Sequence, residues 1–323
     1  MFFQHSKVKF RLLFSQFLAI IPFLIMIFFL IDLWYDTRRT LVIEQNLTQA
    51  RLLAENINTS VDHAMNISRI LADNEIFTFL NQSGNLEDKT RLKQTLKTIT
   101  GNIPPITNIA LFDENGNYIE SSLANDSSSN ANISDRLYFQ KAKDSGNAQI
   151  EGPLTGRLSG DNIIIFASPI FIDNQFKGVV SVTISLNQLT DMLSRLLSPE
   201  QNHVLVINNK GEIVLDFNNA NHDLVTNKDE FLTNEYVRNA FNDKQSIIDN
   251  DKIPGIGSGL LLGSVIPVDG DTLNWLIISV DDSNLVFQPI IRTQTFIWLL
   301  ILVAVVSSLA VLSYFLRKTK IIY

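Results

Sequence analysis

Residues 108–120 read NIALFDENGNYIE, and the same arrangement recurs in residues 203–215 as HVLVINNKGEIVL. In each stretch an apolar run leads into a polar turn that contains glycine, and a second apolar run follows the turn. Such a turn between two apolar runs is typical of a β-hairpin, because glycine and asparagine tolerate left-handed backbone angles. The sequence therefore predicts two copies of one hairpin.

The elements that follow the two hairpins also recur in the same order. Two predicted strands follow each hairpin, in residues 162–168, 177–185, 259–266 and 274–280, and further helices are predicted in residues 137–143 and 186–197. This repetition favours two tandem modules divided near residue 200 over one large sheet. With mostly antiparallel strands and helices packed on them, the predicted fold class is α+β.

A long helix is predicted before the first module, from residue 37 to about residue 79, because no proline or glycine interrupts its helical periodicity. Its stripe repeats in steps of three and four residues through Ile43, Leu47, Ala50, Ala54, Ile57, Val61, Ala64, Ser68 and Leu71. Such a stripe either packs on the helix's own domain or pairs with its twin in a homodimer, and both interpretations remain open here.

Two apolar runs lie near the ends of the chain, in residues 12–35 and 295–316. Each is about long enough to cross a hydrocarbon core of roughly 30 Å as a helix. A cleavable signal peptide is the alternative for the first run, but its end at Ile31-Asp32-Leu33-Trp34-Tyr35 lacks the small residues of a cleavage site. We therefore expect two transmembrane helices that bracket the modules.

Basic residues set the expected orientation. Lys7, Lys9 and Arg11 precede the first run, and Arg317, Lys318 and Lys320 follow the second, so both termini are expected in the cytoplasm of a bacterial cell. The predicted organisation is a cytoplasmic N-terminus (1–11), a first span in the inner membrane (12–35), a stalk helix region (36–100), a membrane-distal module (101–199), a membrane-proximal module (200–292), a second span (295–316) and a cytoplasmic stub (317–323).

Composition argues against several classes of function. The chain has no cysteine, which excludes thiolate catalysis, cysteine metal sites and disulfides. Its acidic segment 36–294 disfavours nucleic acid as a partner. The four histidines are isolated, so we expect no catalytic constellation, no metal site and no cofactor. The segment 255–259 is interpreted as a plain turn, and the pair Asp281-Asp282 as the cap of a helix that enters the membrane.

Four further stretches follow one another in an order that supports a family resemblance: DRLYFQKA in 135–142, GPLTGRLSG in 152–160, ASPI in 167–170 and GVV in 178–180. Placed between two spans, this order resembles the double Cache (dCache) sensor domain of bacterial chemoreceptors, histidine kinases and diguanylate cyclases. The resemblance covers roughly residues 36–294. It implies two tandem PAS-like modules, each an antiparallel sheet with flanking helices.

The resemblance also implies a site for a small metabolite in the distal module, with Arg136, Tyr138 and Phe139 facing the pocket. A guanidinium offers paired donors that match a carboxylate, and an aromatic wall excludes water from that pair. The alternative is a surface arginine beside two core aromatics.

The amino-acid-binding branch of the family holds the ligand's amine with acidic residues, whereas Gly156 and Thr183 occupy those positions here. A buried ammonium without a carboxylate is costly, so we expect a small organic anion in preference to an amino acid. Arg157 is either a second anion contact or a brace for its loop. Thr155 and Thr183 are candidate hydrogen-bonding groups.

The expected function is that of a membrane-anchored sensor, without a catalytic role, that acts as a homodimer. Ligand binding would shift residues 179–186, and the change would pass through the proximal module to residues 281–292 and the second span. Because seven residues follow Leu316, the signal is expected to reach a cytoplasmic signalling module or partner protein outside this chain. The alternative is an anchored binding or scaffold subunit that recognises a periplasmic protein.

Overall fold

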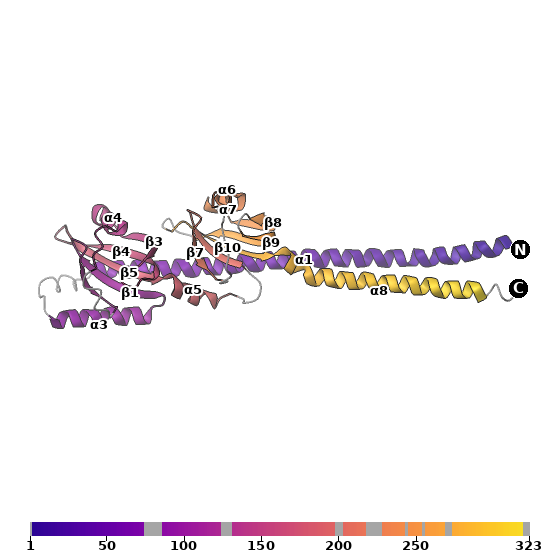
Figure 1. Ribbon diagram of the computed structural model, residues 1–323, viewed down its shortest axis with the longest axis horizontal. Coiled ribbons are helices and arrows are strands. Elements are labelled where there is room, and N and C mark those ends of the chain that lie inside the picture. The colour runs from indigo at the N-terminus through magenta and orange to yellow at the C-terminus, as the bar shows by residue number, and fades with distance from the viewer. Residues whose placement is uncertain are drawn as a thin grey trace.

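The computed structural model describes residues 2–73, 86–123, 131–197, 203–217, 228–242, 245–253, 256–268 and 273–318. One helix of 71 residues, α1 (Phe2–Ala72), runs along the molecule. Two β-sheet modules follow one another along it, and the final helix α8 (Ser283–Lys318) returns beside its first half, so that both termini lie at one end (Figure 1).

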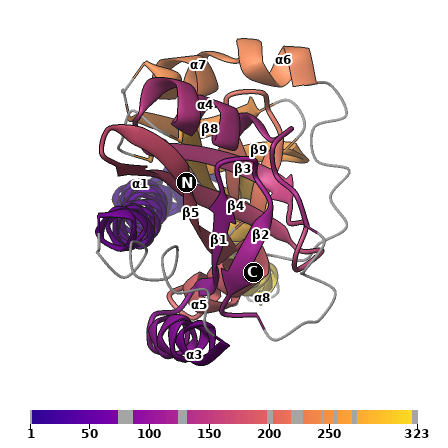
Figure 2. The same ribbon diagram turned by 90° about the vertical axis from the view of Figure 1, so that its left-hand side faces the viewer.

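The distal module is built on a five-stranded antiparallel sheet. Its strands are β1 (Ile106–Asp113), β2 (Tyr118–Ser121), β3 (Gln149–Thr155), β4 (Asn162–Ile172) and β5 (Gln175–Ser185), in the order β2-β1-β5-β4-β3. Its helices are α3 (Leu86–Asn102), α4 (Leu137–Ser145) and α5 (Leu186–Ser194). Figure 2 shows α4 on one face of this sheet and α1 and α3 on the other.

The proximal module repeats the same topology. Its strands are β6 (His203–Asn208), β7 (Ile213–Asp216), β8 (Ser246–Ile253), β9 (Ile256–Pro267) and β10 (Trp275–Asp282), in the order β7-β6-β10-β9-β8. The short helices α6 (Lys228–Thr233) and α7 (Glu235–Phe241) cover it where α4 covers the distal sheet. Two antiparallel sheets and a long N-terminal helix confirm the predicted α+β class.

The two predicted hairpins are present, and their turns are built alike. The Asp113 carboxylate accepts the backbone amides two and four residues later, at 2.9 and 2.8 Å. Asn208 accepts the corresponding amides at 2.9 Å each. Gly116 and Gly211 follow with φ of 77° and 70°, angles that glycine adopts without strain.

The helical stripe on α1 is buried by the chain itself. Its members from Leu47 to Leu71 are all buried, and Ile43 is partly buried. Most of them belong to one apolar cluster that continues through α3 and into both sheets. The stripe therefore packs on its own domain, and pairing with a second copy in a homodimer stays a prediction.

Several elements differ from the sequence prediction. The edge strands β3 and β8 and the helices α6 and α7 were not predicted, and the segment 256–259 begins strand β9 instead of forming a turn. Helix α5 ends at Ser194, three residues before the predicted end.

The predicted stalk region consists of α1 and a separate helix, α3. Residues 74–85, which connect these two helices, lie outside the described residues, and so does the predicted loop 125–130. Strand β3 contains Gly-Pro and strand β8 contains a run of polar residues, so neither sequence was recognised as a strand.

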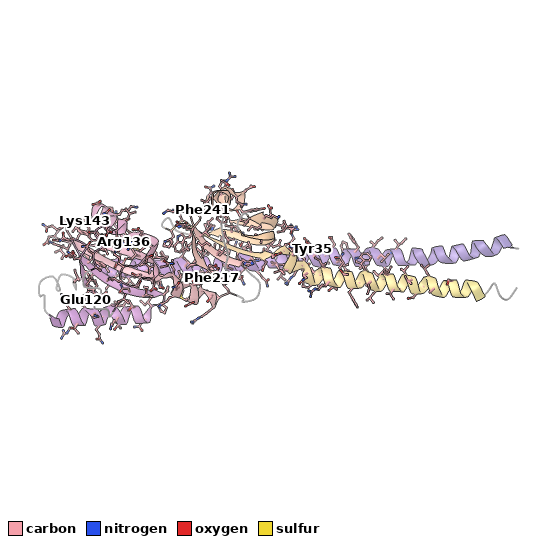
Figure 3. All side chains as sticks on the ribbon, in the orientation of Figure 1. Tyr35, Glu120, Arg136, Lys143, Phe217 and Phe241 are labelled. Atoms are coloured by element: carbon pink, nitrogen blue, oxygen red, sulfur yellow. The ribbon has the colours of Figure 1, made fainter. Side chains whose placement is uncertain are left out.

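One helix in the described part of the chain is long and apolar enough to cross a membrane, over Ser283–Ala310 with a mean hydropathy of 2.0. The predicted first span lies within α1, and the arrangement with two spans stays a prediction. The two helices meet where they leave the proximal module: the rings of Tyr35 and Phe287 stack with centroids 3.8 Å apart (Tyr35 is labelled in Figure 3).

A glycine at the β1–β5 contact is expected to be essential for the distal fold. Gly178 has φ of 150°, and a Cβ there would lie 2.0 Å from the carbonyl oxygen of Phe112. We expect Gly178→Ala to destabilise the full chain by about 3 kcal/mol or more, measured by thermal unfolding in detergent. Gly101→Ala is the control, because its Cβ meets nothing within 4 Å. Equal melting temperatures for the two variants would contradict this expectation.

Candidate ligand-binding site

A small cavity of about 30 Å³ lies in the distal module, between the sheet face that carries α4 and the loop 156–161. Strands β1, β4 and β5 form its floor, and Tyr138 of α4 forms part of its wall. Its lining consists of Asn108, Phe112, Ile133, Tyr138, Gly156, Arg157, Leu158, Ser159, Ile163, Ile165, Ser181 and Thr183.

The start of α4 positions the aromatic residues. Arg136 is the N-cap residue, with extended backbone angles and no capping hydrogen bond from its side chain. Instead, the backbone amide of Tyr138 donates to a carboxylate oxygen of Glu151 on β3, at 2.7 Å. This bond satisfies one of the amides that a helix N-terminus leaves unpaired, and it ties α4 to the sheet.

Three of the six predicted site residues line the cavity: Tyr138, Arg157 and Thr183. Phe139 is buried beside them but packs edge-to-face on Phe176, with ring centroids 5.8 Å apart. Arg136 donates to the backbone carbonyl of Thr155 at 3.1 Å, so these two residues brace the exposed rim (Arg136 is labelled in Figure 3). Arg136, Phe139 and Thr155 thus lie outside the lining of the cavity, and the role of all six residues in ligand binding stays a prediction.

Arg157 is held by an ion pair across the mouth of the cavity. Its guanidinium binds both carboxylate oxygens of Asp135, one of them at 2.7 Å, and also donates to the carbonyl of Asn132. The hydrogen bond from Arg157 lowers the pKa of Asp135, and the same bond raises the pKa of Arg157. The pair joins the loop 156–161, which lines the cavity, to the segment before α4.

The interior of the site offers neutral hydrogen-bonding groups. Burial raises the pKa of Tyr138, so its phenol stays protonated at neutral pH. Among the described residues, no hydrogen-bond partner reaches the hydroxyls of Tyr138 and Thr183. Asn108 and Ser181, which sequence reasoning missed, add an amide and a hydroxyl from β1 and β5. Strand alternation was the available signal, because Ser181 and Thr183 share one face of β5.

The cavity in this structure is much smaller than a metabolite pocket. About 30 Å³ holds one or two water molecules, whereas ligand pockets usually enclose roughly 300–1,000 Å³. A Cβ on Gly156 would lie 2.7 Å from the Ser159 hydroxyl, so the loop is already tightly folded. A ligand therefore enters only if the loop 156–161 and the segment around Asp135 move apart.

Comparison with known proteins identifies the fold. The family model described as Cache domain (dCache_1) matches residues 35–290, so the chain belongs to the Cache-domain family, as its sequence motifs had indicated. No curated protein sequence matches the chain.

Solved domains of proteins described as a histidine kinase, a sensory box/GGDEF family protein and a chemoreceptor have the same fold. The extracellular domain of a protein described as the histidine kinase vpHK1S-Z8 superposes with a TM-score of 0.62 at 16% identity, covering 79% of this chain and 95% of that one. A domain of a sensory box/GGDEF family protein from Vibrio parahaemolyticus gives 0.60 at 15% identity, with 76% and 97% covered. The ligand-binding domain of the Campylobacter jejuni chemoreceptor Tlp3, in complex with L-valine, gives 0.54 at 13% identity, with 78% and 97% covered.

The buried hydroxyl of Thr183 provides a test of the cavity. Thr183→Val removes a group without a described partner at nearly constant volume, so we expect the melting temperature to change little while ligand affinity falls about five-fold or more. Affinity is measured by calorimetry on the full chain, with any compound that raises its melting temperature. Thr190→Val, on α5 outside the cavity, is the control. Unchanged affinity of Thr183→Val would place the ligand elsewhere.

Proposed function

We propose that this protein is a membrane-anchored sensor that binds a small organic anion in its distal module and passes the change to the membrane. The observation that carries the proposal is the small cavity of the distal module, whose lining combines one arginine with neutral hydrogen-bonding groups. Membership of the Cache-domain family and the signalling proteins among its structural relatives support it.

The charge of the lining favours an anion. Arg157 is the charged residue among those that line the cavity, and no described lining residue is acidic. A carboxylate or related group would pair with this guanidinium, and the hydroxyls of Tyr138 and Thr183 would bind its other polar atoms. An amino acid such as the L-valine bound by Tlp3 would bring an ammonium group that meets no carboxylate in the interior.

The path to the membrane is short. Strand β10 ends at Asp282 and helix α8 begins at Ser283, so a shift of the proximal sheet acts directly on α8. We place residues 12–35 and 295–316 in the inner membrane of a bacterium, with residues 36–294 outside and both termini in the cytoplasm. The protein then acts as a homodimer without catalysis of its own, through a cytoplasmic signalling module or partner protein.

The size of the cavity favours a second candidate. A volume of about 30 Å³ suits a module that binds no metabolite, as in an anchored scaffold subunit that recognises a periplasmic protein. In that case the ion pair of Arg157 with Asp135 is a permanent brace.

A thermal-shift screen of the full chain in detergent separates the two candidates. The panel holds organic acids, amino acids, amines and purines; binding at a hundred-fold excess over Kd stabilises by about 2.7 kcal/mol. We expect stabilisation by an organic acid, and loss of the shift in Arg157→Ala.

Arg136→Ala is expected to weaken the shift less, because its side chain braces the rim. Arg238→Ala, on the exposed surface of α7 in the proximal module, is the control and should keep the full shift. A panel without any stabilising compound would favour the scaffold. A shift that survives in Arg157→Ala would contradict the proposed site.

A further inference from the structure

A second cluster of polar side chains lies buried in the proximal module, between α1 and the sheet. Asn46 of α1 is fully buried. Its amide nitrogen donates to a carboxylate oxygen of Asp281 at 2.7 Å and to the carbonyl of Val42 at 3.0 Å. Its amide oxygen accepts from the hydroxyl of Ser279 at 2.6 Å. Asn46, Ser279 and Asp281 form what we call the proximal polar cluster.

The surroundings of this cluster keep Asp281 away from water. Ser264 on β9 pairs with Ser279, and its fully buried hydroxyl has no hydrogen-bond partner in the described part of the chain. Toward the membrane, the neighbouring core is apolar and consists of Val42, Leu262, Val286, Phe287 and Ile290. A carboxylate with 5% of its residue surface exposed in such an environment is costly to ionise.

Few charges face Asp281 from the elements around it. Burial raises the pKa of Asp281 to about 6; the hydrogen bond that Asn46 donates and the charge of Arg38 of α1 both favour the ionised form and offset only part of this effect. Arg39 is bound by Asp249 of β8, and Asp282 caps the start of α8 through the amide of Asn284. Strand β9 and residues 283–291 of α8 contain no charged residue. His203 of β6 lies beside Val280 and, by strand alternation, on the opposite face.

The cluster joins the two segments that lead toward the membrane. Asn46 belongs to the continuous helix α1, and Asp281 is the penultimate residue of β10, directly before α8. The hydroxyl of Ser283, the first residue of α8, donates to Asn250 of β8 at 2.7 Å. A change in the bond between Asn46 and Asp281 therefore changes how α8 is held against α1.

We propose that Asp281 is a proton-binding site that makes the contact between α1 and α8 depend on the pH outside the membrane. In its neutral form the carboxyl group stays buried against Asn46. After loss of the proton the carboxylate draws in water and moves toward Arg38, which displaces β10 and the start of α8. The proton is thus a second input, separate from the ligand of the distal cavity.

The direction of the pH effect follows from the raised pKa. The folded chain holds this proton more tightly than the unfolded chain, whose aspartates titrate near pH 3.9 or so. The stabilising contribution of the neutral cluster is therefore complete below that pH, and it is lost as the pH rises through about 6.

Distance measurement between two spin labels tests the proposal on the full chain in lipid nanodiscs. The sequence has no cysteine, so Thr40→Cys on α1 and Leu285→Cys on α8 place labels at two exposed sites without background. Between about pH 4.5 and about pH 8 we expect the distance distribution to change with a midpoint near pH 6. Asp281→Asn, which mimics the neutral form, is expected to keep the low-pH distribution throughout.

Two further variants make the result specific. Asp282→Asn changes the adjacent, half-buried acid, and this variant should show the same pH dependence as the unmodified chain. Asn46→Asp places a second carboxylate against Asp281, so one of the two holds its proton more tightly and the midpoint should rise by about one pH unit or more. This variant and the unmodified chain decide the question if Asp281→Asn does not fold. The proposal would be overturned if the distance distribution of the unmodified chain did not change with pH, or if Asp281→Asn showed the same midpoint as the unmodified chain.

Discussion

Burial of one face of α1 by both sheets is the constraint on which the rest of the structure depends. Leu53 and Ile57 in the middle of the helix have no exposed surface, and their cluster continues into the distal and the proximal module. Burying a leucine or isoleucine stabilises by about 1.5–3 kcal/mol, so the stripe holds each module firmly to the helix. Neither sheet can shift relative to α1 without disturbing this shared core.

Polar contacts within this apolar interface specify how the helix sits on each sheet. In the distal module the hydroxyls of Ser68 and Ser168 lie 2.8 Å apart, and in the proximal module Asn46 binds Ser279 and Asp281. Apolar packing alone tolerates sliding, whereas a buried hydrogen bond is lost when its partners separate. The proximal contact includes the titratable carboxyl group of Asp281, so its charge can change with pH. The distal module and the proximal polar cluster thus contact the same helix at two positions.

The repeated hairpins and the α1 stripe were readable from sequence because they depend on local spacing. The edge strands were not readable from the sequence. The polar run in β8 forms a strand because it pairs with β9 on one side. At the candidate site, Tyr138 of the predicted motif lines the cavity. The pairing of Arg157 with Asp135 was not predictable, because it joins residues 22 positions apart that only the fold brings together. Asp281 was expected to cap a helix together with Asp282. Only Asp282 does so, because strand alternation turns Asp281 into the interface with α1.

In the proposed mode of binding, a small organic anion enters the distal module by parting Arg157 from Asp135. Hydrogen exchange of the full chain in nanodiscs, with and without the anion that stabilises it best, tests this mode of binding. We expect the anion to slow the exchange of backbone amides in residues 132–138 and 156–161 and in strands β1 and β5, and we expect no such slowing in Arg157→Ala. Protection confined to other surfaces, or no change in these segments at saturating anion, would contradict it.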